Sequence, residues 1–411
     1  MSRFTAISAF LLAAFPASQL LADGLSLSAA TQRVLAGNPQ MIVNAARLDA
    51  AEGRVIQAGA LPNPELTYLL EDFAGDTSRS AGQATTTYSL SQRVSLPGKR
   101  SARKAFARED GALTALEAQS GRLRLIRLTR EAYIDALAGA ERLAAAEQNQ
   151  QLAQQLRDAV AARVDAGKVS PIELSRASVA LAGARRGSQQ AMRLSELSRK
   201  QLAALWGATS LTETLDDSLG LPAKPAASPL TADDSPVIRQ ARKRIQREQA
   251  AVALAEAQRL PDFTLSGGMK REAVTREQSV LVGISVPIPL FDRNRGGVQS
   301  ARADLRAAEA ALAVGNQQLQ REQDQLLTQR EGNYQDALQL RDEVLATASE
   351  ALEATREGYR AGKFSLIDLL DAQRSLMDAQ SAYLAARITF HKSDAALDEL
   401  LGRVTETGNT P

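Results

Sequence analysis

Hydrophobic and polar residues alternate strictly in a few short stretches of the chain and recur at helical spacing almost everywhere else. Tyr88, Leu90 and Val94 alternate with polar neighbours in one stretch, interrupted on the apolar side only by Gln92. Such period-two alternation predicts a strand with one apolar and one polar face. Four strands are predicted in this way, at 65–72, 85–94, 263–270 and 279–288, forming two pairs within 64–94 and 262–289.

A very long helix is predicted after each strand pair. The segments at about 98–166 and 293–361 lack proline and are rich in Ala, Leu, Gln, Arg and Glu. At 1.5 Å per residue, each segment makes a helix of about 100 Å. In the second segment a leucine recurs every seven residues, which indicates a left-handed coiled-coil seam. The residues in this register are Leu305, Leu312, Leu319, Leu326 and Leu340, with Asn333 in the gap.

Shorter helices complete each half of the chain. The first is interrupted at Asn38-Pro39, because proline disfavours helical continuation. Prolines and small polar residues mark 207–235 as a linker, and the polar tail 403–411 is expected to be loose. The shorter helices are expected at 28–59, 171–206, 236–259 and 365–401.

The second half of the chain repeats the first. When Gly167 is set on Gly362, an offset of 195, an Ala-Gly-Lys tripeptide, a serine, an isoleucine and an acid match in register. Glycine is suited to end one helix and serine to begin the next, so each copy is predicted to be the tip of a helical hairpin. The two repeats span 23–206 and 236–402. The sequence thus predicts a mainly α fold with a small β part, built from internally duplicated long α-helical hairpins.

The N-terminus is typical of a targeting segment. Residues 1–22 contain the three parts of a signal peptide, namely Arg3, an apolar run over 6–15 and the small Ala22 before the expected cleavage point. No later segment approaches the ~20 apolar residues of a transmembrane helix. A mature chain in a membrane is therefore expected to form a barrel. Four strands are too few to close one, whereas three copies supply about twelve, within the range of outer-membrane barrels.

Composition limits the chemistry that the chain can perform. Its 411 residues include 49 basic and 47 acidic ones, and this balance does not favour nucleic acid as a partner. Cysteine is absent and His391 is the one histidine, so no cofactor and no usual zinc or copper site is expected. His391 is expected at the surface or at an interface. The loop at 358–363 is one residue short of a phosphate-binding loop and joins two helices, so no enzyme is predicted.

The duplication, the two strand pairs, the long helices and the two Ala-Gly-Lys tips together resemble the TolC-like outer-membrane efflux duct family. The resemblance covers essentially the whole mature chain, and Ser95–Arg100 is similar to the strand-to-helix segment of the heavy-metal (CusC/CzcC-type) efflux branch. It implies a homotrimer with a 12-stranded transmembrane β-barrel in outer-membrane lipid and a coiled-coil barrel that extends into the periplasm. It also implies a periplasmic adaptor (membrane fusion) protein and an inner-membrane RND pump as partners.

In such ducts the hairpin tips constrict the periplasmic end, and acids on the second hairpin line the opening. Asp368 and Asp371 stand at the matching positions on one helix face, so threefold symmetry would gather six carboxylates into a ring that favours cations. Tyr359 resembles an aromatic that helps hold the tip shut, and Phe364 stands where a basic latch residue is expected. The alternative is that the acids interact favourably with the positive N-terminal end of the helix dipole, as Glu173 does in the first half. The residues implied to contact the adaptor are Gly167, Lys168, Ser170, Gly362, Lys363 and Ser365.

The sequence favours a passive exit duct of a tripartite efflux system, with heavy-metal cations among the candidate substrates. Two alternatives remain open, an outer-membrane duct for type I protein secretion and a secreted periplasmic coiled-coil scaffold without a pore. The scaffold leaves the alternating strands unexplained. Four basic residues at the start of the first long helix are expected to be solvated and to contact headgroups at the inner rim of the barrel. They are Lys99, Arg100, Arg103 and Lys104.

Overall fold

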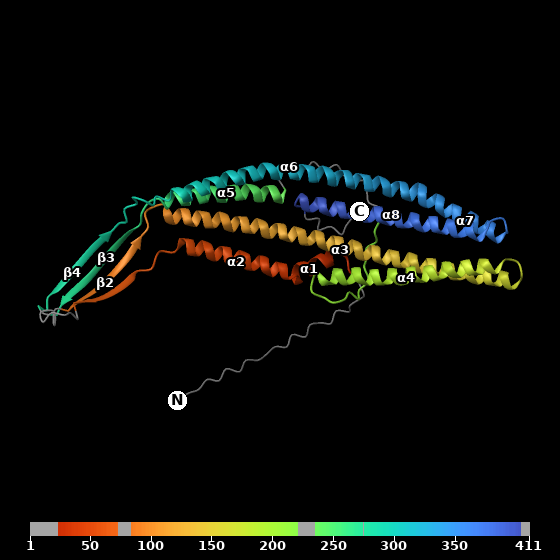
Figure 1. The fold of residues 1–411 in the computed structure, drawn as a ribbon, viewed down its shortest axis with the longest axis horizontal. Coiled ribbons are helices and arrows are strands. Elements are labelled where there is room, and N and C mark those ends of the chain that lie inside the picture. Colours follow the sequence, from red (N-terminus) through yellow and green to blue (C-terminus); the bar gives the residue numbers. More distant parts are fainter. Residues whose placement is uncertain (1–23, 73–83, 221–234, 274, 404–411) are drawn as a thin grey trace, which may run out of the picture.

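The protein is a long rod of helices with a small sheet at one end and two helical hairpin tips at the other (Figure 1). The computed structural model describes residues 24–72, 84–220, 235–273 and 275–403. The predicted signal segment 1–22 lies outside the described residues, as do 221–234 of the predicted linker and 404–411 of the tail.

The two halves of the chain have the same order of elements from α2 and α5 onward, apart from a π-helical turn in the second long helix. The first half contains α1(Leu27–Gly37), α2(Pro39–Gly59), β1(Glu65–Glu71), β2(Thr85–Val94), α3(Lys99–Asp165) and α4(Pro171–Ala204). The second contains α5(Pro236–Ala257), β3(Phe263–Glu272), β4(Gln278–Ser285), α6(Arg295–Gln339), the π-helical turn η2(Leu340–Leu345), α7(Ala346–Arg360) and α8(Leu366–Leu400). The mainly α fold class, with long duplicated hairpins and four strands in each chain, is confirmed.

The four strands form one antiparallel sheet in the order β1-β2-β3-β4. Because side chains alternate between faces, the register decides which residues share a face. Leu66 pairs with Leu90, and Tyr68 with Tyr88, whose rings lie 5.1 Å apart. The same rows continue across β3 and β4 through Gly267 with Val282 and Met269 with Val280. One face is therefore apolar along these central rows and ends at the mainly polar row of Thr86, Arg271 and Gln278. The other face carries Thr67, Ser89, Ser91, Thr264, Ser266, Lys270 and Ser285.

Strand β4 ends at Ser285, three residues before the predicted end of the alternating run at 288. Alternation continues through Val286 and Ile288, but Pro287 and Pro289 have no backbone N–H to donate. The ladder with β3 accordingly stops at the pair Thr264 and Ser285. The side-chain pattern predicted the strand correctly, and the missing donors set its end.

Each long helix has shorter helices lying end to end along it (Figure 1). Along α3 these are α2 with α1, then α4. Asn38 lies at this junction, where its side chain accepts from Gln40 N at 2.8 Å and donates to Leu205 O at 2.6 Å. Along α6 they are α5 and α8, whose Ile238 and Leu400 both pack on Leu319. A buried seam thus follows the predicted leucine register.

The second long helix departs from the prediction at η2, where one turn is π-helical. A π turn contains one residue more than an α-helical turn. Leu345, five residues after Leu340, therefore lies where the residue four positions after Leu340 would lie in a regular α-helix. The seven-residue spacing then resumes as Leu345, Leu352 and Tyr359, and the last two pack in one buried cluster. The turn therefore keeps the apolar seam on the same face as far as the hairpin tip.

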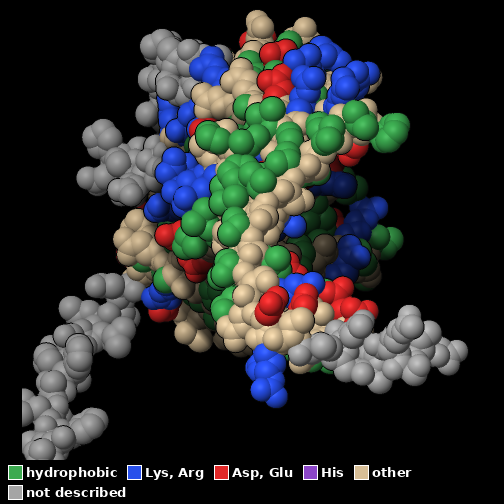
Figure 2. Space-filling view, turned by 90° about the vertical axis from the view of Figure 1, so that its left-hand side faces the viewer, with side chains coloured by type: hydrophobic (Ala, Val, Ile, Leu, Met, Phe, Trp, Pro, Cys, Tyr) green, Lys and Arg blue, Asp and Glu red, His purple; other side chains and the backbone are tan. Residues whose placement is uncertain are grey.

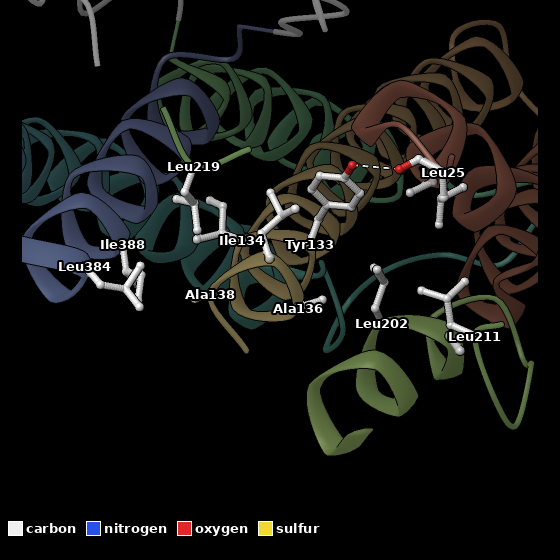
Figure 3. Close-up of a cluster of buried hydrophobic side chains, with 13 residues drawn as sticks. Leu25, Tyr133, Ile134, Ala136, Ala138, Leu202, Leu211, Leu219, Leu384 and Ile388 are labelled. Atoms are coloured by element: carbon white, nitrogen blue, oxygen red, sulfur yellow. Dashed lines mark hydrogen bonds between the residues drawn. The ribbon is translucent and has the colours of Figure 1, made fainter. Parts of the chain in front are cut away.

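The largest apolar core lies midway along the rod, where the two halves meet (Figure 3). Tyr133 of α3 is buried there, and its hydroxyl donates to Leu25 O at 2.7 Å. Asp217 Oδ2 lies 2.8 Å from the same hydroxyl. Burial and the Asp217 carboxylate raise the pKa of Tyr133. The contact joins the residues before α1 and the first part of the linker to α3.

A ladder of ion pairs ties α3 to α8 beside this core. Arg130 binds Asp394 and Asp398, each at 2.8 Å, and both partners lie on successive turns of α8. Because these side chains are largely shielded from water, their pairs are screened less than surface pairs. Further pairs in the ladder are Arg127 with Glu399, Arg387 with Glu141 and Lys392 with Asp135.

Candidate gate and membrane-facing sheet

The two hairpin tips have the same backbone geometry. Gly167 and Gly362 adopt positive φ angles of 69° and 74°, which a side chain disfavours. Lys168 N donates to Arg163 O, and Lys363 N donates to Gly358 O, so both helices end in a Schellman motif. The predicted tip residues are therefore brought to one end of the rod. The next helices begin at the N-caps Ser170 and Ser365.

Tyr359 joins the second hairpin to the first. Its side chain is 7% exposed and packs against Val160 of α3 and against Leu366 and Leu369 of α8. The Arg163 guanidinium lies over the ring at 4.9 Å from its centroid. Burial raises the pKa of Tyr359, and the nearby Glu173 carboxylate raises it further. We call this buried group, with Ala177 of α4, the tip cluster.

Polar contacts reinforce the tip cluster. The Tyr359 hydroxyl donates to Glu173 Oε2 across 3.4 Å, and Arg163 donates to Tyr359 O across 3.3 Å. Arg163 and Glu173 belong to the first hairpin, so both contacts cross between the two halves of the chain. Sequence analysis did not assign Arg163 a role, because its partner is a backbone carbonyl and a ring almost 200 positions away.

The equivalent acids of the two hairpins have different roles. Asp368 forms a capping box, in which its carboxylate accepts from Ser365 N at 2.8 Å while Ser365 Oγ accepts from Asp368 N at 3.3 Å. The hydrogen bonds that Ser365 N and Ser365 Oγ donate to the carboxylate lower the pKa of Asp368. Glu173, at the same helix position, reaches the Tyr359 hydroxyl instead. The geometry of Asp368 matches the helix-start alternative, whereas Asp371 is exposed one turn further along.

Phe364, which stands in the position of a basic latch residue, packs on its own hairpin. A methyl group at Gly358 would lie 2.1 Å from a ring carbon of Phe364, so the ring covers the bare backbone there. About half of the Phe364 side chain remains exposed at the tip. The neighbouring Lys363, and Lys168 at the first tip, are exposed to solvent.

The apolar face of the sheet is exposed on the isolated chain. Figure 2 views the molecule from the sheet end and shows hydrophobic side chains running as a band over the strands. The most exposed are Leu66, Tyr68, Tyr88, Leu90, Met269, Val280, Val282 and Ile284. Apolar faces of this extent are covered in functional proteins by lipid or by another chain.

The basic residues at the start of α3 are more firmly bound than the sequence suggested. Lys99 forms an ion pair with Asp262 at 2.7 Å, and only 13% of its side chain is exposed. Arg100 Nε donates to Gly59 O at 2.6 Å. The expectation of a solvated group is therefore wrong for Lys99. Its partner Asp262 comes directly after Leu260-Pro261, just beyond the short helix α5 in the other half of the chain. Both contacts fasten the start of α3 to the neighbouring connections.

The one histidine lies partly buried beside the midway core. Its ring meets Phe390 edge-on with centroids 5.4 Å apart, and Nε2 is 3.4 Å from Gly220 O. Burial lowers the pKa of His391. Within the described residues, no three His, Cys, Asp or Glu side chains are placed to hold a metal ion. No described helix is both long and apolar enough to span a membrane.

Comparison with known sequences and structures identifies relatives along almost the whole chain. The chain is 31% identical to the cobalt-zinc-cadmium resistance protein CzcC of Cupriavidus metallidurans, covering 93% of this chain and 91% of CzcC. It is 32% identical to the nickel-cobalt-cadmium resistance protein NccC of Alcaligenes xylosoxydans, covering 71% and 67% of the two chains.

Solved structures share the fold at lower identity. The outer-membrane channel OprN superposes with a TM-score of 0.79 at 21% identity, covering 93% of this chain and 91% of OprN. CusC superposes with a TM-score of 0.78 at 16% identity, covering 92% of each chain. The model of the outer membrane efflux protein family matches residues 30–208 and 228–403. With both halves of the duplication matched, the chain belongs to the outer membrane efflux protein family.

Proposed function

We propose that three copies of this chain form a passive exit duct in the outer membrane, through which a pump and its adaptor discharge heavy-metal cations. One observation carries the proposal: a four-stranded sheet with one largely apolar face stands at the end of a helix of 67 residues, about 100 Å long. The sheet has the faces that a barrel needs, lipid outside and water inside.

The open edges of the sheet support a trimer. Strands β1 and β4 lie at the two edges, each with a row of backbone groups that no described strand pairs. Such edges invite pairing with another chain. Pairing β1 of one protomer with β4 of the next closes a ring without changing the sheet. Three protomers give about twelve strands, an even number within the usual range for outer-membrane barrels.

Heavy-metal cations are the proposed substrate class because of the relatives named above. The matched proteins are resistance proteins for cobalt, zinc, cadmium and nickel. Polypeptide secretion has no comparable support, and a pore-free scaffold conflicts with the exposed apolar face of the sheet. The adaptor and the inner-membrane RND pump would dock at the tips, near Gly167, Lys168 and Lys363.

The tip cluster is the proposed gate. Tyr359 holds the second hairpin against Arg163 and Glu173 of the first, and separating the hairpins would expose its ring. Asp371 lines the opening in this proposal, whereas Asp368 positions the helix that carries it through the capping box. Docking of the adaptor on the tips would supply the free energy to part the two hairpins.

A growth experiment tests the export function. Deletion of the gene should lower the cobalt, zinc or cadmium concentration that stops growth, and the wild-type gene should restore it. A gene encoding a chain without residues 64–94 serves as the control, because it removes one strand pair and hence the barrel. Unchanged metal tolerance on deletion, in a host without a second duct of this family, would refute heavy-metal export.

A further inference from the structure

An unusual apolar segment connects β4 to α6. Phe291 is 99% exposed and Ile288 is 77% exposed, and Leu290 and Val286 are exposed beside them. The apolar row of β4, with Val282 and Ile284, leads directly into this segment. The connection therefore extends the apolar face of the sheet beyond the last paired residue.

Side-chain hydrogen bonds hold the backbone of this connection in place. Asn294 adopts a left-handed conformation with φ 51°, and its side chain donates to Ala255 O of α5 at 2.8 Å. Asp292 accepts from Asn294 N at 2.9 Å, and Arg293 Nε donates to Pro289 O at 3.1 Å. These contacts fix the backbone on both sides of Phe291, so its exposure follows from an ordered turn.

The backbone of the connection suits an apolar environment. Pro287 and Pro289 have no N–H, and Leu290 N donates to Ile288 O at 2.9 Å. Residues 287, 289 and 290 therefore leave no backbone N–H without a partner, and an unsatisfied N–H next to hydrocarbon is costly.

Two arginines follow Phe291 in the sequence. Arg293 and Arg295 are exposed, and neither forms an ion pair with any described residue. Asn294 binds the end of α5 at Ala255, so the exposed Arg259 belongs to the same end of the rod. Figure 2 shows Lys and Arg side chains at the top of the view, beside Asp and Glu side chains. Apolar side chains followed by arginines suit a membrane interface, where the apolar side chains enter the edge of the hydrocarbon and the guanidinium groups bind phosphates.

We infer that the segment 286–295 is an interfacial anchor that binds anionic phospholipid, with Phe291 in the lipid and Arg293 and Arg295 on the phosphate groups. This inference rests on the proposed membrane function. The phospholipid that the segment binds belongs to the leaflet on the helical side of the barrel, because the segment lies at the end of the strands from which the helices extend (Figure 1). Phosphatidylglycerol supplies the negative headgroup in the test.

The position of residue 291 can be measured by fluorescence. The chain has one tryptophan, Trp206, which packs in the midway core. In a Phe291→Trp variant reconstituted in vesicles, the second tryptophan adds fluorescence that the wild type lacks. Lipids brominated near the headgroup should quench this added fluorescence. Absence of quenching in a trimer shown to be inserted would overturn the inference and place residue 291 against a neighbouring subunit or in water.

Lipid preference tests the arginines. Native mass spectrometry of trimers released from 1:1 phosphatidylglycerol and phosphatidylethanolamine should show preferential retention of phosphatidylglycerol. Arg293→Gln with Arg295→Gln should lower that preference by about fivefold for each arginine. The matched control is Arg186→Gln with Arg193→Gln on α4, two exposed arginines away from the strands, which should change nothing.

The outcomes separate this inference from the function on which it rests. A chain that never inserts into vesicles contradicts the membrane function itself. A chain that inserts as a trimer and retains both lipids equally, before and after the arginine changes, contradicts only the anchor.

Discussion

The Tyr359 hydroxyl lies 3.4 Å from Glu173 Oε2, although 186 positions separate the two residues along the chain. This contact crosses from the second hairpin to the first at the end of the rod where both hairpins turn. Arg163 lies over the same ring, so an acid and a base of the first hairpin hold one tyrosine of the second. The contact gives the proposed gate a specific set of side chains to test.

Truncation of Tyr359 should open the gate. Tyr359→Ala leaves a cavity in the tip cluster and should cost about 3 kcal/mol, typical of large-to-small changes at buried aromatic sites. Tyr359→Phe keeps the packing and loses only the hydroxyl contact. Single-channel conductance in planar bilayers should rise clearly for Tyr359→Ala and slightly for Tyr359→Phe. Equal conductance for all three proteins would remove Tyr359 from the gate.

The tyrosine contact should persist through neutral pH. Burial and Glu173 raise the pKa of Tyr359 above its ordinary value of 10.0, so the neutral phenol is the form that the folded state favours. Its contribution is fully present below the unfolded pKa and is lost as pH rises through the folded one. Conductance should therefore be constant from about pH 6 to 9 and rise only in stronger base. A rise in conductance between pH 7 and 9 that Tyr359→Phe abolishes would contradict this assignment.

The two acids of the second tip should behave differently. Asp371→Ala should weaken block of the channel by divalent cations, because its exposed carboxylate is the one assigned to the opening. Asp368→Asn should affect selectivity less and helix stability more, since its carboxylate binds Ser365. The lowered pKa of Asp368 means that this cap is present above pH 3.8 and is lost as pH falls through the folded value. Ser365→Ala is the matched cap variant, expected to cost about 1 kcal/mol.

If Asp371→Ala and Asp368→Asn leave cation block and ion preference unchanged, neither acid lines the pore. If Asp368→Asn alone changes selectivity, the assignment of the two roles is reversed.

Because of the π turn, deletion of one residue within η2 and insertion of one residue after it should have different effects on the position of Tyr359. Deletion of Val344 should convert η2 into α-helix and leave Tyr359 on the same face, because the turn holds one extra residue. Insertion of one alanine after Ala351 should rotate Tyr359 by about 100° away from Glu173. Uptake of a large antibiotic should stay low for the deletion and rise for the insertion. The opposite order would show that η2 does not set the register.

Loss of the Tyr133 hydroxyl should destabilise the junction between the two halves. Tyr133→Phe removes the donor that Leu25 O and the Asp217 carboxylate share. Each acceptor keeps one backbone donor, so the loss costs about 1 kcal/mol. Thermal unfolding of the purified protein should show a lower midpoint, while Tyr334→Phe, at a less buried site, serves as the control. An unchanged midpoint for Tyr133→Phe would mean that water replaces the donor.

Local signals in the sequence predicted most of the fold. The strand at 85–94 and the helix start near 98 agree with β2 and α3, because alternation and Pro97-Gly98 both act over a few residues. The hairpin tips agree for the same reason, since glycine and serine determine their turns locally. The outer membrane efflux family was also identified correctly from the duplicated pattern.

What the sequence missed depends on pairs far apart in the chain. The π turn has a visible signal in the sequence, since the leucine spacing changes from seven to five between Leu340 and Leu345. The pairing of Lys99 with Asp262 joins the two repeats and has no local signature. The roles of Asp368 and Asp371 stay predictions, because a gate on a threefold axis involves three chains.

The most direct measurement is a disulfide scan between the two edge strands, which the absence of native cysteine makes unambiguous. Thr67→Cys on β1 is combined in turn with Ser279→Cys, Leu281→Cys or Ser285→Cys on β4, all on the polar face. The account predicts that one pair yields covalent trimers in outer-membrane fractions, whereas each single-cysteine chain stays monomeric on denaturing gels. Monomers from every pair, with the chain recovered without detergent, would contradict a closed barrel of three copies.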